Sequence, residues 1–471
     1  MHSLRRTVGA VIVAMCCIST APAGAAGLPP TVVQQLVRAG LPREAVGIVV
    51  QDTASGRIVV EHSADQPFAP ASVMKLVTTL AGLDVLGPAY AWRTQAWTTA
   101  KQSGQVLDGD LIIKGGGDPR LLMEHLSMFL RQLRARGIRE IRGNLVLDRS
   151  WLRPEALDPA QFDNGPDRPY NALPDALLLN FRSLTVRLLP DVQAGLVRVS
   201  TEPPVASWPV AAPLLGEGPC NDWRGQLRMR SAAQGLAMDG EYPSSCGERS
   251  IAMHAWQMSA DAYFGAVFRQ LWSELGGSLA GQVLTGAVPA EARLLDEWTS
   301  PPLLDAVRDI NKYSNNVMAR QLFLSVGAQA AGLPADTNKA ALAIHDWLRG
   351  RGVAAPGLVL DNGSGLSRSE RITPRTLADL LGWAWRSPLM PEFVSSLPLT
   401  GLDGTMRNRL RNSPAAGHVK TGSLADVRSV AGYIQAASGK RYVVVGIINH
   451  AQAGAAMGAL DALLQWVVEQ G

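Results

Sequence analysis

The stretch APASVMKLVTT, residues 69–79, places a serine three residues ahead of a lysine in a run with the apolar composition of a helix interior. Positions i and i+3 share one face of a helix, so Ser72 and Lys75 can touch if Ser72 lies near the first turn. A hydroxyl beside an amine is typical of a nucleophile beside its base. The alternative is a lysine on an amphipathic helix whose charged end reaches solvent.

Lysine is rare in this chain, which makes the position of Lys75 informative. The sequence has 7 lysines among 44 basic residues, and the other 37 are arginines. Arginine stays charged in proteins, whereas a buried lysine can lose its proton. A lysine in an apolar helix start therefore indicates amine chemistry, and Ser-x-x-Lys occurs only once here.

A second segment offers another hydroxyl and a carboxamide. In DINKYSNNVMARQLFL, residues 309–324, Ser314 and Asn316 open an apolar-periodic segment. We expect this segment to be a helix that begins near Ser314. The alternative interpretation is a plain N-cap, for which serine and asparagine are the ordinary residues.

A third segment, HVKTGSLADVRSVAGYIQAASGKRYVVVGIINH, predicts three antiparallel strands over residues 418–450. Lys420, Thr421, Gly422 and Ser423 lie in the first strand. Glycine weakens a strand, so Gly422 indicates the close approach of another backbone or of a ligand. The alternative for Lys420 is a charge that protects an edge strand from aggregation.

The first 25 residues have the pattern of a secretory signal peptide. Arg5 and Arg6 precede an apolar run, and Ala23-Gly24-Ala25 offers a small-residue cleavage site. The run is too short for a membrane span of about 20 residues, so we expect a soluble, secreted mature chain. Twin-arginine export and a lipid anchor at Cys16 or Cys17 remain alternatives.

Cleavage would lower the formal charge from +4 to +2, because it removes two arginines and no acid. No basic stripe indicates nucleic-acid binding. Cys220 and Cys246 would be the remaining cysteines, and in an oxidising compartment such a pair indicates a disulfide rather than a metal site. The seven histidines lack metal-ligand spacing, so we expect neither metal nor organic cofactor.

A chain of 471 residues is too long for one ordinary core. Residues 26–94 predict a helix, a hairpin and the Ser72 helix, and residues 288–471 predict the Ser314 helix, the three strands and a final helix over 455–468. Neither piece closes a core alone. Together they predict an α/β domain with an antiparallel sheet and helices on both faces, interrupted by a strand-rich insertion over 95–287. The final helix has no cationic face and is expected to pack on the sheet rather than anchor a membrane.

The ordered set Ser-x-x-Lys, Ser-x-Asn and Lys-Thr-Gly resembles the triplet of penicillin-binding proteins and class A β-lactamases. More narrowly, the sequence resembles the low-molecular-mass class C penicillin-binding proteins, which are D-alanyl-D-alanine carboxypeptidases and endopeptidases. The separation of roughly 240 residues between Lys75 and Ser314 carries this likeness, because a β-lactamase would have far fewer there. So do GDLIIKGGGDPRL, residues 109–121, and LDNGSGLSR, residues 360–368, although Asn362 lengthens the second motif by one residue.

The resemblance implies a discontinuous, transpeptidase-like penicillin-binding domain of residues 26–94 and 288–471. It also implies that the insertion splits into two small β-rich domains, one nested in the other. The enzyme would be periplasmic, would take peptidoglycan stem peptides and β-lactams as its partners, and would cut cross-linked as well as free stems. A serine β-lactamase and a catalytically weak scaffold of wall machinery remain the alternatives, and no protein partner is implied.

The resemblance also implies roles for the site residues. Ser72 would attack the carbonyl, Lys75 would take its proton, and Ser314 would relay a proton to the leaving amine. Asn316 would hold the backbone amide of the substrate, and Lys420 and Thr421 would bind its terminal carboxylate. The N–H groups of Ser72 and Ser423 would form the oxyanion hole.

Two choices stay open at this point. Tyr313-Ser314-Asn315 also reads as the Tyr-x-Asn element of class C β-lactamases, and we favour Ser314 and Asn316 because the long insertion matches the group with Ser-x-Asn. The resemblance also implies an acidic residue on the insertion that faces the amino group of the substrate, and Asp163 and Asp167 are the candidates for it.

Overall fold

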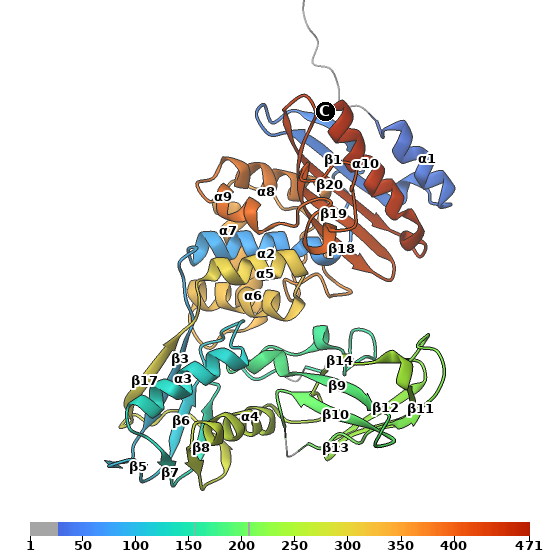
Figure 1. The fold of residues 1–471 in the computed structure, drawn as a ribbon. Coiled ribbons are helices and arrows are strands. Elements are labelled where there is room, and N and C mark those ends of the chain that lie inside the picture. The colour runs from blue at the N-terminus through green and yellow to red at the C-terminus, as the bar shows by residue number, and fades with distance from the viewer. Residues whose placement is uncertain (1–26, 156, 206–207) are drawn as a thin grey trace, which may run out of the picture.

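The computed structural model describes residues 27–155, 157–205 and 208–471 (Figure 1). The expected signal peptide lies outside the described residues. The first and last parts of the chain share one antiparallel five-stranded sheet, in which β1 and β20 are neighbours. Its strand order is β18 (Gly417–Leu424), β19 (Val427–Gln435), β20 (Arg441–Asn449), β1 (Val46–Asp52) and β2 (Ile58–His62).

Side chains of this sheet alternate between two hydrophobic cores, as the period of a strand requires. In β1, Ile48 and Val50 pack toward one face and Val49 packs toward the other. The first face is covered by α1 (Pro30–Arg38) and α10 (Met457–Gln470). The expected fold class, an antiparallel sheet with helices on both faces, is therefore confirmed.

Six helices belong to the core on the second face, and they include the segments that carry the chemistry (Figure 1). They are α2 (Lys75–Val85), α5 (Leu303–Tyr313), α6 (Asn316–Ala331), α7 (Thr337–Gly350), α8 (Pro374–Arg386) and α9 (Met390–Ser396).

The final helix packs on the sheet, as expected. Leu460, Leu463 and Leu464 of α10 are buried there. Among residues 27–155, 157–205 and 208–471, no helix is both long and apolar enough to cross a bilayer.

The insertion contains one larger mixed sheet and a small sheet beside it, with α3 (Met123–Ala135) and α4 (Ala260–Glu274). The larger sheet has the order β16 (Val283–Thr285), β8 (Leu145–Asp148), β6 (Leu111–Lys114), β3 (Arg93–Thr98) and β17 (Arg293–Thr299). The small sheet has the order β15 (Ser278–Leu279), β7 (Glu140–Ile141), β5 (Val106–Leu107) and β4 (Gln102–Ser103).

Two further three-stranded sheets lie between β8 and α4 in the sequence. Their orders are β10 (Leu196–Glu202), β9 (Ser183–Asp191), β14 (Arg249–His254), and β11 (Leu214–Gly216), β13 (Gly235–Pro243), β12 (Leu227–Ala232). The chain therefore leaves the larger sheet after β8, forms the two three-stranded sheets, and then returns to the larger sheet with β16 and β17. Buried side chains of both groups of sheets belong to one continuous hydrophobic cluster, so the division into two nested domains stays a prediction.

The edge of the insertion differs from the expected range of 95–287. β17 pairs with β3 from Arg293 with Thr98 to Thr299 with Arg93. Both strands therefore belong to the sheet of the insertion, and we propose that the insertion comprises residues 93–299. The expected disulfide is present, since Cys220 and Cys246 are bonded to each other.

Candidate active site

Ser72 lies on a single turn of 3-10 helix, η2 (Ala71–Met74), directly before α2. Ala71 has a φ of 48°, a left-handed conformation that is rare for alanine and typical of strained backbone at functional sites. Lys75 is 0% exposed, and its Nζ lies 2.9 Å from Ser72 Oγ. The contact predicted from the spacing of the two residues is therefore present.

Two more oxygen atoms surround the amine of Lys75. Asn316 Oδ1 lies 2.5 Å from Nζ, and the backbone carbonyl of Ser364 also accepts a hydrogen bond from it. Together with Ser72 Oγ, all three contacts of the amine are with neutral oxygen atoms. None of these partners stabilises the ammonium form as a carboxylate would.

Burial lowers the pKa of both Lys75 and Lys420. Burial lowers the pKa of Lys75 well below its ordinary value, and the nearby charge of Lys420 lowers it further. Burial lowers the pKa of Lys420 to about 7. The expectation that Lys75 is a candidate neutral amine near pH 7 agrees with these directions.

The Ser-x-Asn segment lies at the start of a helix, as expected, and Ser314 itself precedes that helix. Ser314 lies between α5 and α6 with a φ of 59°, and its Oγ accepts a hydrogen bond of 2.8 Å from Lys420 Nζ. Asn315 caps α6 through the N–H of Met318, so the first helical residue is Asn316. The side chain of Tyr313 is 70% exposed. These positions favour the Ser314 register.

Lys420, Thr421, Gly422 and Ser423 lie on β18, which is an edge strand of the sheet. Lys420 is 0% exposed, and its Nζ also donates to the carbonyl of Thr421. The hydroxyl of Thr421 donates to Thr405 Oγ1 over 2.7 Å. Sequence reasoning did not find Thr405, because it lies on a single turn of 3-10 helix, η6 (Gly404–Met406), that has no recognisable sequence pattern.

Two glycines press against the backbone of the Ser72 turn. A Cβ at Gly422 would lie 2.8 Å from Ser72 N, and a Cβ at Gly365 would lie at the same distance and only 1.8 Å from the carbonyl oxygen of Ala71. The expected close approach at Gly422 is therefore to the backbone that carries Ser72. Gly365 comes from the 360–368 motif and has a φ of 78°, so a side chain there would be strained as well.

A cavity of about 760 Å³ lies between the insertion and the loop of residues 361–369. Glu155 and Asp158 line it, but the candidates Asp163 and Asp167 do not. The carboxylate of Asp163 accepts hydrogen bonds within its own loop from Arg168, Tyr170, Asn171 and Gly165. The acidic residues that line this cavity are therefore other ones than the two candidates on the insertion.

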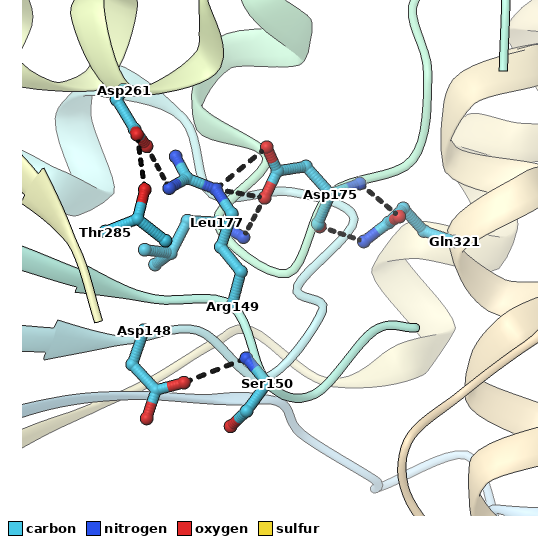
Figure 2. Close-up of polar contacts among 8 residues, drawn as sticks. All are labelled: Asp148, Arg149, Ser150, Asp175, Leu177, Asp261, Thr285 and Gln321. Carbon is cyan, nitrogen blue, oxygen red and sulfur yellow. Dashed lines mark hydrogen bonds and ion pairs between the residues drawn. The ribbon is translucent and has the colours of Figure 1, made fainter. Parts of the chain in front are cut away.

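The insertion is joined to α6 by a partly buried polar cluster, the junction cluster of Arg149, Asp175, Asp261 and Gln321 (Figure 2). Arg149 Nε donates to both carboxylate oxygens of Asp175, at 2.8 and 3.1 Å, and Arg149 Nη1 pairs with Asp261. Gln321 of α6 accepts from the N–H of Asp175 and donates to its carbonyl. Since Asn316 begins the same helix, the cluster braces the insertion against the element that carries part of the site.

Comparison with known proteins gives a consistent result. Residues 31–469 match the family described as D-Ala-D-Ala carboxypeptidase 3 (S13). A D-alanyl-D-alanine carboxypeptidase of Actinomadura sp. is 32% identical over 436 residues, which cover 87% of this chain and 78% of the relative. The D-alanyl-D-alanine carboxypeptidase DacB of Haemophilus influenzae is 26% identical over 412 residues, which cover 86% of this chain and 85% of the relative.

The fold is also found in a solved structure. The crystal structure of penicillin binding protein 4 (dacB) from Haemophilus influenzae superposes with a TM-score of 0.78 at 24% identity, and the match covers 93% of this chain and 99% of that one. The chain therefore belongs to the D-Ala-D-Ala carboxypeptidase 3 (S13) family and is a low-molecular-mass class C penicillin-binding protein.

Proposed function

We propose that this D-Ala-D-Ala carboxypeptidase cleaves the terminal D-alanine from peptidoglycan stem peptides through a covalent ester on Ser72. One observation carries the proposal: a fully buried lysine contacts the Ser72 hydroxyl and otherwise only neutral oxygen atoms. Such an amine can act as the base that makes a serine nucleophilic. No metal or organic cofactor takes part in the proposed steps.

The hydrogen bonds of Lys75 suit the neutral amine. A neutral amine has two N–H groups and one lone pair, and the carbonyl oxygens of Asn316 and Ser364 can accept only N–H. The lone pair is then left for the O–H of Ser72. Neutrality near pH 7 needs a fall of about 3 pKa units, or about 4 kcal/mol, from the ordinary lysine value. Burial and the charge of Lys420 both act in this direction.

Lys420 would act on the leaving group of the reaction. Lys420 donates to Ser314 Oγ, which leaves the proton of that hydroxyl for the departing amine, and the proton that Lys75 took from Ser72 would replace it on Ser314. The ammonium of Lys420 and the hydroxyls of Thr421 and Ser423 would bind the terminal carboxylate of the substrate, because charged hydrogen bonds to carboxylates are the strong ones.

The backbone would hold the rest of the substrate. β18 is an edge strand, so an extended peptide can pair with it. The side-chain amide of Asn316 would bind the substrate backbone. The N–H groups of Ser72 and Ser423 would form the oxyanion hole, where each donor contributes about 3 kcal/mol. Water then hydrolyses the ester and releases the shortened stem.

We also propose DD-endopeptidase activity and a periplasmic location. A peptide cross-link joins the carbonyl of D-alanine to an amine that neighbours a carboxylate, so Lys420 and Thr421 would bind it as they bind the terminal D-alanine. The signal-like residues 1–25 and the disulfide between Cys220 and Cys246 support export to an oxidising compartment.

Two incubations test the proposal. The mature protein is mixed with labelled penicillin and, separately, with a stem pentapeptide and a cross-linked stem dimer. A long-lived adduct on Ser72 together with release of D-alanine supports the carboxypeptidase mechanism, and cutting of the dimer supports the endopeptidase. Rapid turnover of penicillin would indicate a β-lactamase, and no reaction would indicate a scaffold. Ser72→Ala should abolish the adduct.

The choice between Ser314 and Tyr313 has its own measurement. Acylation by penicillin is timed for Ser314→Ala and for Tyr313→Ala. The larger loss is expected for Ser314, since its hydroxyl contacts Lys420. A larger loss for Tyr313→Ala would contradict the proposed role of Ser314.

A further inference from the structure

Glu370 is a fully buried carboxylate that has no part in the steps above. It is 0% exposed and accepts hydrogen bonds from four backbone N–H groups of the preceding loop. Oε1 accepts from Asp361, Asn362 and Gly363 at 3.2, 3.0 and 2.7 Å, and Oε2 accepts from Gly365 at 2.8 Å. Burial raises the pKa of Glu370, and the backbone N–H groups of Asn362, Gly363 and Asp361 act against this rise because they favour the ionised form.

The loop that Glu370 holds, residues 361–365, contacts the nucleophile turn and α2. The carbonyl of Ser364 accepts from Lys75 Nζ, and the carbonyl of Gly363 accepts from Thr78 Oγ1 over 2.6 Å. Gly365 lies against the backbone of Ala71 and Ser72. The carboxylate is thus the centre of a loop whose outer face touches the proposed nucleophile and its proposed base.

The orientation of the Lys75 amine depends on this loop. The carbonyl oxygens of Ser364 and Asn316 accept its two N–H groups, and the lone pair is directed at Ser72 only while both carbonyls stay in place. Asn316 is fixed by the start of α6. Ser364 is fixed by a loop outside regular secondary structure, whose backbone N–H groups converge on Glu370.

Glu370 also contributes charge. Burial lowers the pKa of Lys75, the cations Lys420 and Arg320 lower it further, and the carboxylate of Glu370 opposes them. Asp361 lies near Glu370 and, like Glu370, faces Arg320. Loss of the Glu370 charge would therefore lower the pKa of Lys75 further.

We propose that Glu370 is a positioning residue for the base of this enzyme: it fixes the loop of residues 361–365 so that the Ser364 carbonyl directs the Lys75 lone pair at Ser72. This inference rests on the proposed Ser72 mechanism. It assigns a role to a residue that contacts neither the substrate nor the reacting atoms.

The test measures the rate of Ser72 acylation by labelled penicillin across pH for wild type, Glu370→Gln and Glu370→Asp. Glu370→Gln keeps the size but removes the charge and sets an N–H₂ group against the N–H of Gly365. We expect acylation at the pH optimum to slow about tenfold, and the acid limb to move about one pH unit lower. Glu370→Asp keeps the charge but shortens the reach, so its rate should fall while its acid limb stays in place.

A matched control is Asp148→Asn. Asp148 is also buried and accepts from two backbone N–H groups, those of Ser150 and Val288, but it lies in the insertion (Figure 2). Its variant should lose stability without a change in the pH profile of acylation.

Three results are decisive. An unchanged rate and acid limb in Glu370→Gln would overturn the inference, and so would an equal loss of rate in Asp148→Asn. If Glu370→Gln does not fold, Glu370→Asp decides, and a wild-type rate in that variant overturns the inference. Failure of the wild-type protein to form an adduct on Ser72 would instead contradict the proposed function itself.

Discussion

The proposed active site buries a basic side chain fully and the junction cluster buries one in part, and the two differ in the partners that they give it. At the junction, Arg149 meets the carboxylates of Asp175 and Asp261 (Figure 2). In the active site, Lys75 meets only neutral oxygen atoms. Carboxylates stabilise a buried cation, whereas burial beside neutral groups favours its loss of a proton. The junction cluster thus stabilises the charge of Arg149, whereas the surroundings of Lys75 favour its neutral form.

A third cation sharpens this difference because it lies close to the active site. Lys312 precedes Ser314 by two residues and is 6% exposed, yet its Nζ pairs with Asp403 over 2.6 Å. A buried lysine of this domain that has no proposed chemical role, Lys312, therefore pairs with a carboxylate that stabilises its charge. The lack of such a partner at Lys75 is a property of the site and not of lysine burial in general.

The largest effect should follow from removing the amine of the active site. Lys75→Met keeps an apolar stem in the helix and cannot accept a proton, so acylation by labelled penicillin should slow about a thousandfold. Lys440→Met, at an exposed lysine before β20, is the control and should acylate at the wild-type rate. A loss of less than tenfold in Lys75→Met would mean that another group activates Ser72.

A smaller loss of acylation rate should follow if Lys75 is given a carboxylate partner, as Arg149 has in the junction cluster. Asn316→Asp places a carboxylate where Asn316 Oδ1 now contacts Lys75, which should raise the pKa of Lys75. Acylation at pH 7 should then fall about a hundredfold and recover as the pH rises, because the neutral amine is populated only above the raised pKa.

The control for that substitution is Asn316→Ala, which removes the side-chain amide but adds no charge. Its rate should fall without an upward movement of the acid limb. If both variants have the same pH profile, the partner of Lys75 does not set its protonation.

The second lysine gives a third test, with an effect of about tenfold. Burial lowers the pKa of Lys420 to about 7, so the cation that would bind the substrate carboxylate in the proposed mechanism is lost as pH rises through this value. The kcat/KM for a stem pentapeptide should fall about tenfold per pH unit above the pKa. Lys420→Arg keeps its charge at all these values and should lack this alkaline fall, although its absolute rate will be lower. An alkaline limb that persists in Lys420→Arg would assign the fall to another group.

The smallest effect on activity is expected at the junction. Asp175→Asn removes one of the two carboxylates that face Arg149, which should lower the free energy of unfolding by about 3 kcal/mol. Acylation of the folded protein should stay within about twofold of wild type, since the protonation of Lys75 does not depend on the junction. Denaturant unfolding and penicillin acylation measure the two quantities. A large loss of acylation at full folding would show that the junction also sets the geometry of Ser72.

The sequence was sufficient to predict the parts of the candidate site that depend on residue type and local spacing. The i, i+3 spacing of Ser72 and Lys75, the close approach at Gly422 and the three antiparallel strands all follow from local rules. The structure gives the same arrangement at these positions.

The remainder of the site depends on contacts that leave no local pattern. The third partner of Lys75 is a backbone carbonyl, and any residue at position 364 supplies one. Glu370 looks like an ordinary surface acid until its four N–H donors are seen. β17 reads equally well as a strand of either sheet, and only its pairing with β3 assigns it to the insertion.

The two glycines beside the Ser72 turn constrain how such an enzyme can evolve resistance to penicillin. Gly365 and Gly422 come from separate segments, and each leaves no space for even a methyl group next to the Ser72 N–H. A substitution at either position displaces the serine that the cell-wall substrate also needs. On the proposed mechanism, mutational escape is therefore directed away from the Ser72 turn and toward positions where a side chain can change without moving Ser72.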